Sequence, residues 1–248
     1  MSGNYDHRFY ADRHGRTVYA ANAILPIVLD ALPRVDSAAD FGCGVGTWLS
    51  VLKQYGVSEI RGLDGPWVER DLLEIPREDF QEVNLEETIR LERRYDLAIT
   101  LEVAEHISEQ SANSFIDSLV GASDFILFSA AIPFQGGNGH VNEQWPDYWA
   151  KMFAARGYTV IDFVRKKIWD DENISVWYRQ NILLFANEKQ IATVDPTLLV
   201  NVGNSGPLAI VHPEMYRAKL KQRSVKGRVA WFRQGVKSRI MKVLSNRS

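Results

Sequence analysis

A glycine-rich turn is the first feature of this sequence that could bind a ligand. The run Asp40–Thr47 (DFGCGVGT) lies between a short apolar segment and a segment with helical periodicity. Glycines let the backbone turn tightly and approach a ligand closely, and the N-terminus of the following helix favours a negatively charged group. Thr47 occupies the place of the third glycine in a dinucleotide fingerprint, so the pattern is G-x-G-x-G. Such a turn alone fits NAD, FAD or S-adenosylmethionine.

Carboxylates and imidazoles follow this turn at the ends of apolar segments. Asp64 ends the segment 59–63, where a carboxylate can accept two hydrogen bonds from the cis-diol of a ribose. His106 follows the apolar run 95–101, and either acts as a general base or braces the loop. His140 lies in the polar loop Gly136–Trp145 and is the second candidate base. A long polar loop inside a compact domain is more often functional than not.

The elements that must position these residues alternate between strand and helix. Apolar strands alternating with helices predict a parallel sheet that is covered on both faces. The last two predicted strands have no helix between them and are therefore expected to be antiparallel. Pro26 predicts a kink or break in the first helix. The predicted strands are 37–41, 59–63, 80–85, 95–101, 124–130, 158–164 and 177–186, and the predicted helices are 5–32, 47–54, 111–120 and 147–156.

Two of these stretches resemble a known enzyme family. Asp40–Thr47 resembles motif I of class I S-adenosylmethionine-dependent methyltransferases, written D-x-G-C-G-x-G, and Tyr95–Ile107 resembles the D-L-(x)n-E-V-x-E-H stretch of their small-molecule members. The resemblance covers roughly Phe9 to Ala186. It implies an α/β fold with a Rossmann-like seven-stranded sheet, parallel with one antiparallel strand and flanked by helices. It also implies S-adenosylmethionine as cofactor and in-line transfer of its sulfonium methyl group.

The resemblance assigns cofactor contacts to positions of this chain. The acid at Asp40 orients the loop and the amino group of the cofactor, and Asp64 binds the ribose hydroxyls. Asn84 stands where the family usually has an acid that meets the adenine amino group, so the charge is absent there. The predicted cofactor-binding residues are Asp40, Gly42, Gly44, Gly46, Asp64, Asn84, Leu85, Leu101 and Glu102.

A weaker resemblance concerns the methyl acceptor. Gly139–Trp149 is similar to a stretch of bacterial methyltransferases that occur with glycan and polysaccharide biosynthesis enzymes, which implies O-methylation of a sugar or polysaccharide-linked hydroxyl. His140 and His106 are the predicted catalytic residues. The predicted substrate-binding residues are Asn142, Glu143, Trp145 and Tyr10.

Several alternatives to this function stay open. Trp149 is expected in the core of the helix 147–156 rather than against a sugar. His140 and Glu143 alone fall short of a metal-ligand set, so no metal is expected. Another small-molecule acceptor, methylated on nitrogen or oxygen, or a non-catalytic cofactor-binding module would also use the glycine turn.

Charge divides the 248 residues into two parts. Residues 217–248 hold 11 Lys or Arg and no Asp or Glu; the rest of the chain holds 29 − 11 = 18 basic residues against 31 acidic ones. We expect a methyltransferase domain at 1–190 and an extension at 191–248 that ends in a basic amphipathic helix. This helix fits an anionic membrane surface or partner, docking on the acidic body, or RNA, although the acidic body disfavours a nucleic-acid substrate. The single cysteine and the absence of a signal or membrane-spanning run predict a cytoplasmic protein, with peripheral contact to the inner membrane through the helix.

Overall fold

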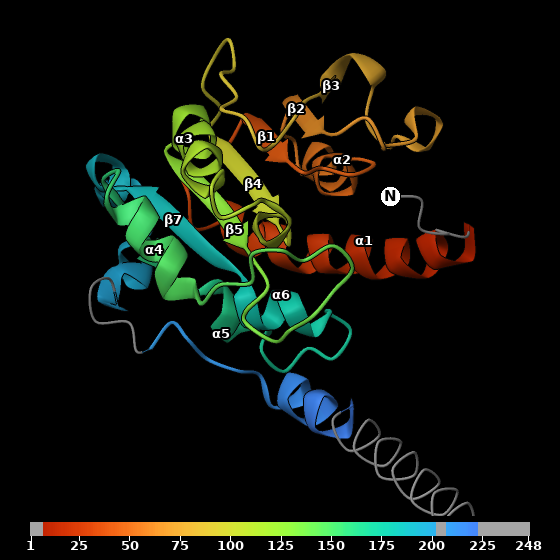
Figure 1. Ribbon diagram of the computed structural model, residues 1–248. Coiled ribbons are helices and arrows are strands. Elements are labelled where there is room, and N and C mark those ends of the chain that lie inside the picture. Colours follow the sequence, from red (N-terminus) through yellow and green to blue (C-terminus); the bar gives the residue numbers. More distant parts are fainter. Residues whose placement is uncertain (1–6, 202–206, 223–248) are drawn as a thin grey trace, which may run out of the picture. The chain divides into compact units, whose positions relative to one another are not determined.

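The computed structural model describes residues 7–201 and 207–222, and for residues 7–13 and 199–201 it describes the backbone alone (Figure 1). The chain divides into two compact units, residues 1–210 and 211–248, and every element named below belongs to the first. The strands are β1 (Ser37–Phe41), β2 (Glu59–Asp64), β3 (Phe80–Glu82), β4 (Leu97–Leu101), β5 (Phe125–Ser129), β6 (Tyr158–Ile161) and β7 (Leu183–Asn187). The helices are α1 (His7–Leu29), α2 (Thr47–Gln54), α3 (Ala112–Ala122), α4 (Pro146–Ala154), α5 (Val164–Ile168) and α6 (Val176–Asn181).

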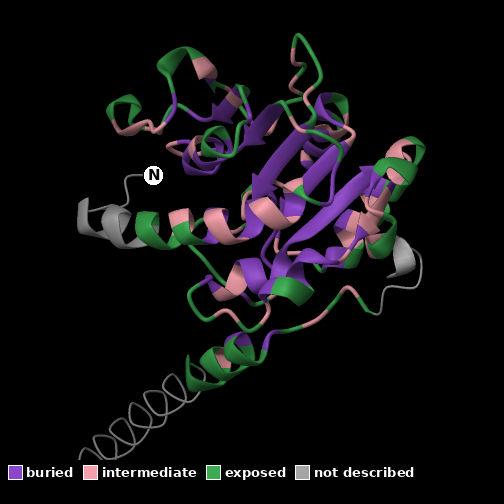
Figure 2. Ribbon diagram, turned by 180° about the vertical axis from the view of Figure 1, so that it is seen from behind, coloured by how far each residue is buried: buried purple, intermediate pink, exposed green. Residues whose placement is uncertain are grey.

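The seven strands form one sheet in the order β3-β2-β1-β4-β5-β7-β6. β1, β2, β3, β4 and β5 pair in parallel, whereas β7 runs antiparallel to both β5 and β6. Every residue of β1, β4 and β5 is buried, because helices cover both faces of the sheet (Figure 2). The predicted fold, a seven-stranded Rossmann-like methyltransferase sheet with one antiparallel strand, is confirmed.

Two apolar clusters hold the helices on the sheet. One joins α1, α2, α5 and α6 to one face, and it includes Ile24, Leu49 and Ile99. The other joins α3 and α4 to the opposite face, and it includes Ala98 and Phe115. Ala98 and Ile99 are consecutive residues of β4 that point to opposite faces, as the pleat of a strand requires.

The prediction of a strand over 177–186 without a preceding helix is wrong in its first half. The backbone forms α5 and then α6, and β7 begins only at Leu183. Arg179 on α6 is buried and donates to the carbonyl oxygens of Ile174 (2.9 Å) and Trp169 (3.2 Å). A short apolar run with β-type residues cannot be assigned to helix or strand from its periodicity alone.

Of the predicted kink or break in the first helix, the break does not occur, because α1 continues through Pro26. Proline has no N–H, so the carbonyl of Asn22 loses its helical donor. The Tyr55 hydroxyl donates to that carbonyl at 3.4 Å instead. Within the described part of the chain, no helix combines the length and the apolar character needed to cross a membrane.

Candidate active site

The strand order reverses between β1 and β4, and the first candidate site lies at the carboxyl ends of these two strands. A ligand crevice is expected at such a switch point in an open α/β sheet. A cavity of about 400 Å³ lies here, within the usual volume of a small-molecule site. Its wall includes Asp40 in β1 and Gly44 after it, Leu101 at the end of β4 and Glu102 after it, and Trp67 after β2.

The glycine turn is fixed by close packing on one side and is open on the other. Gly42 and Gly46 have φ angles of 86° and 88°, and a Cβ atom there would come within 2.4 Å of Val103 and 2.8 Å of Ile75. Gly44 also has a positive φ, but no described heavy atom lies within 4 Å of the position of its Cβ. The turn therefore presents bare backbone to the cavity at Gly44, so that a ligand can approach closely.

Asp40 brings a buried carboxylate to the wall of this cavity. Its side chain is almost fully buried, and its Oδ2 atom has no hydrogen-bond partner among the described residues. Burial, and secondly the charge of Asp64, raise the pKa of Asp40 well above its usual value. An unpaired buried carboxylate favours a cationic ligand group, because that group would compensate the charge.

Asp64 holds the turn in place. Its two carboxylate oxygens accept hydrogen bonds from the N–H groups of Gly44 and Gly65, both at 2.7 Å. Burial raises the pKa of Asp64, and these two hydrogen bonds oppose that rise. Asp64 is not among the residues that line the cavity, so its contact with a ribose stays a prediction.

The remaining predicted cofactor residues divide between the cavity and its surroundings. Gly42, Leu101 and Glu102 line it, whereas Gly46, Asn84 and Leu85 do not. The exposed Asn84 side chain donates to Glu87 at 2.8 Å, and Leu85 packs in the core. The sequence analysis missed three residues on or next to α6 that line the cavity, namely Ser175, Trp177 and Tyr178; it placed the last two in a strand.

Glu102 marks the end of β4 and connects three elements. It adopts a φ of 58°, which is uncommon for a residue other than glycine and often occurs at functional sites. Its carboxylate accepts hydrogen bonds from the amides of Gln135 (2.9 Å) and Asn181 (3.0 Å), and its N–H donates to the Ser129 carbonyl oxygen at 2.9 Å. The side chain is thus held rigidly in the cavity wall.

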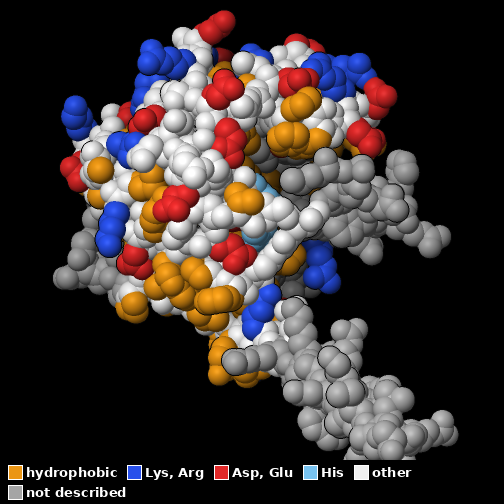
Figure 3. Space-filling model, in the orientation of Figure 1, with side chains coloured by type: hydrophobic (Ala, Val, Ile, Leu, Met, Phe, Trp, Pro, Cys, Tyr) orange, Lys and Arg blue, Asp and Glu red, His pale blue; other side chains and the backbone are white. Residues whose placement is uncertain are grey.

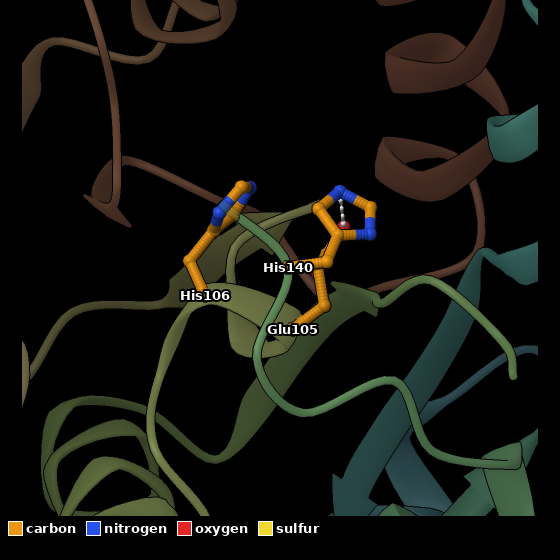
Figure 4. Close-up of side chains that lie close together, drawn as sticks. All are labelled: Glu105, His106 and His140. Atoms are coloured by element: carbon orange, nitrogen blue, oxygen red, sulfur yellow. Dashed lines mark ion pairs between the residues drawn. The ribbon is translucent and has the colours of Figure 1, made fainter. Parts of the chain in front are cut away.

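A second group of polar side chains gathers just beyond Glu102. Glu105 and His106 lie on the short 3₁₀ helix Ala104–His106, and His140 comes from the loop after β5 (Figure 4). The rings of His106 and His140 meet edge to face with centroids 4.8 Å apart, and His140 Nε2 lies 3.9 Å from a carboxylate oxygen of Glu105. Histidine side chains are visible in a hollow of the molecular surface in Figure 3. We call Glu105, His106 and His140 the histidine cluster.

Glu105 is the most deeply buried member of this cluster. Its side chain has no exposed surface, and neither carboxylate oxygen has a hydrogen-bond partner among the described residues. Burial, and secondly the charge of Glu102, raise the pKa of Glu105 to about 9. The two predicted catalytic histidines are thus brought together, and a carboxyl group that sequence reasoning did not single out joins them.

Glu143 holds residues 132–145 together, a loop that we call the acceptor loop after the substrate contacts predicted for it. It accepts hydrogen bonds from the N–H groups of Phe134 (2.8 Å) and Gly136 (2.5 Å), and it contacts His140 Nδ1 at 2.8 Å. Its predicted contact with substrate stays a prediction, because these partners already occupy both oxygens.

The other predicted substrate residues lie in different surroundings. Asn142 is buried and accepts from Gln144 at 2.9 Å, while Trp145 is 39% exposed. Trp149 is buried on α4, so its predicted place in the core is confirmed. The side chain of Tyr10 lies outside the part of the chain that the structure describes.

Comparison with known proteins gives the class of this fold. Residues 12–119 match the family described as "Methyltransferase domain". This match supports the enzyme class predicted from the sequence, and no curated protein matches the chain.

Solved structures that resemble this chain share its fold at low identity. An O-methyltransferase family protein from Burkholderia thailandensis is 17% identical with a TM-score of 0.52, over 74% of this chain and 60% of that one. The small RNA methyltransferase HEN1 is also 17% identical with a TM-score of 0.50, over 76% of this chain. The present chain spans only 26% of the length of HEN1.

The family match covers the glycine turn and the segment Glu102–His106, but it ends before β5. The acceptor loop and α6 therefore lie outside the matched residues. His140 and Glu143 belong to that loop, so the family match does not extend to them.

Proposed function

We propose that this chain transfers the methyl group of S-adenosylmethionine to a hydroxyl of a sugar or a polysaccharide end. The observation that carries the proposal is the position of two sites at the end of one strand. The cavity includes Leu101 and Glu102 at the end of β4, and the histidine cluster begins at Glu105. Methyl transfer needs a cofactor and an acceptor side by side, because its main catalytic requirement is proximity and alignment.

The cavity fits the chemical groups of the cofactor. The α-ammonium group of its methionine part would compensate the buried Asp40 carboxylate. The bare backbone at Gly44 admits the chain of the cofactor, where a side chain would block it. Trp67 is 73% exposed and lines the same cavity, so its ring offers a face on which adenine can stack.

The histidine cluster supplies what a hydroxyl acceptor requires. A neutral hydroxyl is a poor nucleophile, so its proton must leave as its oxygen attacks the sulfonium methyl carbon. The C–S bond then breaks and leaves a neutral thioether. His140 is the group placed to assist the loss of this proton. The loop beside them exposes Phe134, Val141 and Trp145, whose apolar faces suit the C–H face of a sugar ring.

The first test is calorimetric titration with S-adenosylhomocysteine, the product of the cofactor. We expect wild type and Asp71→Ala to bind it and Asp64→Ala to lose binding. Asp71 is a matched control, since its side chain is exposed and lies outside the cavity wall. A folded wild-type protein that does not bind would overturn the proposal.

The second test identifies the acceptor class by measuring S-adenosylhomocysteine release with sugars, phenols and amines. Turnover with sugars supports the proposed acceptor. Turnover only with phenols would redirect the proposal to natural-product methylation. Turnover only with amines, unchanged in His140→Ala, would redirect it to N-methylation, since an amine needs less help from a base.

The basic extension supports a further part of this proposal, a cytoplasmic enzyme that contacts anionic lipid at the inner membrane. The predicted helix of this extension lies almost wholly outside the described residues, so its sequence carries the proposal: 11 Lys or Arg and no acid over 217–248. Full-length protein should co-sediment with anionic liposomes, and a variant truncated before Arg217 should not. Equal sedimentation of both would contradict this membrane contact.

A further inference from the structure

We infer that Glu105, His106 and His140 bind a divalent transition-metal ion beside the cofactor cavity. Each residue offers one ligand atom, and these atoms all lie within 4.8 Å of one another. In a tetrahedral site with ligand bonds of about 2.0–2.2 Å, the ligand atoms are roughly 3.3 Å apart. Small rotations of the three side chains are therefore enough to bring their ligand atoms within bonding distance of one ion. The prediction that no metal binds considered only His140 and Glu143. The fold brings His106 and Glu105 close to His140 as well.

The histidines are held with one ring nitrogen turned toward protein oxygens. His106 Nδ1 lies 3.2 Å from the carbonyl oxygen of Gly139, and His140 Nδ1 lies 2.8 Å from Glu143. A carbonyl oxygen and a carboxylate oxygen accept hydrogen bonds, so each Nδ1 is the donor in these contacts, and in a neutral ring Nε2 then keeps the lone pair that a metal ion needs. Metal-bound histidines almost always have such an outer partner, which fixes the tautomer and orients the ring.

Glu105 gives the independent sign of a missing ligand. A fully buried carboxyl group normally has hydrogen-bond partners, a paired charge or a metal. Glu102 shows this rule three residues earlier, since the amides of Gln135 and Asn181 occupy its oxygens. Neither oxygen of Glu105 has a hydrogen-bond partner within 3.5 Å among the described residues; the backbone N–H groups of Glu105 and Ala131 lie near enough to lower its pKa, and His140 Nε2 is 3.9 Å away. A cation between the ring and the carboxylate would satisfy both groups.

The ligand types indicate which ions fit. Two imidazole nitrogens and one carboxylate suit Mn²⁺, Fe²⁺, Co²⁺ or Zn²⁺, whereas Mg²⁺ and Ca²⁺ prefer oxygen ligands throughout. Three protein ligands also leave coordination positions open, as in catalytic rather than structural sites.

The use of an open position rests on the proposed function. There the acceptor hydroxyl would bind the ion, which lowers the pKa of the hydroxyl. Its proton passes to solvent water, the resulting alkoxide oxygen attacks the sulfonium methyl carbon, and the C–S electron pair stays on sulfur. His140 then serves as a ligand, and the cation replaces it as the group that activates the hydroxyl.

Titration of the full chain with Co²⁺, followed by visible absorption, tests the site without any turnover. We expect one equivalent to give the ligand-field bands of a protein-bound ion, with Zn²⁺ displacing it. His106→Ala and Glu105→Gln should each weaken binding by at least about tenfold. His106 is exposed, so its replacement should leave the fold intact even if Glu105→Gln does not. His14→Ala is the matched control, because His14 also pairs with a glutamate, Glu74, but lies outside the cluster.

The outcomes separate this inference from the proposed function. A folded protein that binds S-adenosylhomocysteine but gives no Co²⁺ bands, or gives bands that His106→Ala and His140→Ala both leave unchanged, would overturn the metal site alone. Stoichiometric Co²⁺ binding that His106→Ala weakens, without binding of S-adenosylhomocysteine, would support the metal site and remove the proposed function.

Discussion

The proposed cofactor side and the proposed acceptor side of the crevice are built in different ways. The cofactor side is the turn after β1, eight consecutive residues whose backbone is fixed by Val103, Ile75 and the Asp64 carboxylate. The acceptor side is assembled from the 3₁₀ helix after β4 and the loop after β5, more than thirty residues apart in sequence. The first depends on backbone shape, and the second depends on side-chain contacts.

This difference has a consequence for how each side responds to mutation. A change in the glycine turn should damage stability and cofactor binding together, because the same packing contacts serve both. A change in the acceptor loop should alter the chemistry while leaving the fold intact, since loops carry function on a scaffold that does not depend on them.

Gly42→Ala should produce the largest effect and tests the rigid side directly. Alanine at a φ of 86° is strained, and its Cβ would lie 2.4 Å from Val103. We expect a loss of roughly 2–4 kcal/mol in the free energy of unfolding, measured with urea. Binding of S-adenosylhomocysteine should be lost as well.

Gly44→Ala is the matched variant for that experiment, since open space surrounds its Cβ. It should cost only about 1–2 kcal/mol of stability from backbone strain. Its methyl group would enter the cavity, so we expect about 10- to 100-fold weaker binding of S-adenosylhomocysteine. Equal loss of stability in both variants would contradict the view that packing fixes one side of the turn only.

Glu143→Ala tests the acceptor side. The substitution removes the acceptor of two backbone N–H groups and the partner of His140 Nδ1. We expect about 10- to 100-fold weaker Co²⁺ binding, because loss of an outer-shell partner has effects of that size. Binding of S-adenosylhomocysteine should not change. Gln144→Ala, a change in the next residue, should leave both affinities near wild type, and a cofactor defect in Glu143→Ala would show that the two sides are not separable.

Asp40→Asn tests whether the buried carboxylate proposed to bind the cofactor lowers the stability of the free protein. The pKa of Asp40 is higher in the folded chain than its ordinary value of 3.8. Its contribution to stability is therefore fully present below the ordinary value and is lost as pH rises through the raised pKa. Asparagine cannot ionise, so the variant should escape that loss.

We expect the free energy of unfolding of Asp40→Asn, measured with urea, to equal that of wild type at about pH 4. At about pH 8 it should exceed that of wild type by about 1–3 kcal/mol. Binding of S-adenosylhomocysteine should weaken about tenfold or more, because a charged hydrogen-bond partner is lost. A variant that is less stable than wild type near about pH 8 would show that the Asp40 carboxylate has a stabilising partner in the free protein.

The contrast between a turn of consecutive residues and a cluster assembled from distant segments also explains what could be predicted from the sequence. The glycine turn, the strands and Asp64 are local patterns, so their types and order are readable from neighbouring residues. The histidine cluster is not local, because it depends on the parallel pairing of β4 with β5, which aligns Leu101 with Ser129. Trp177 and Tyr178 were missed for a different reason: their β-type side chains favour a strand, while the contacts of Arg179 stabilise a helix.

Trp67→Ala should produce the smallest effect and tests where the cofactor side ends. The ring is 73% exposed and lies against Gly65, where a Cβ atom would come within 2.2 Å of it. Its removal should change stability by less than about 0.5 kcal/mol, as for other surface positions. Loss of stacking on adenine should weaken binding of S-adenosylhomocysteine by about 1 kcal/mol, roughly fivefold, in calorimetry. Unchanged affinity would limit the cofactor side to the turn and α6, and would leave Trp67 available for the acceptor.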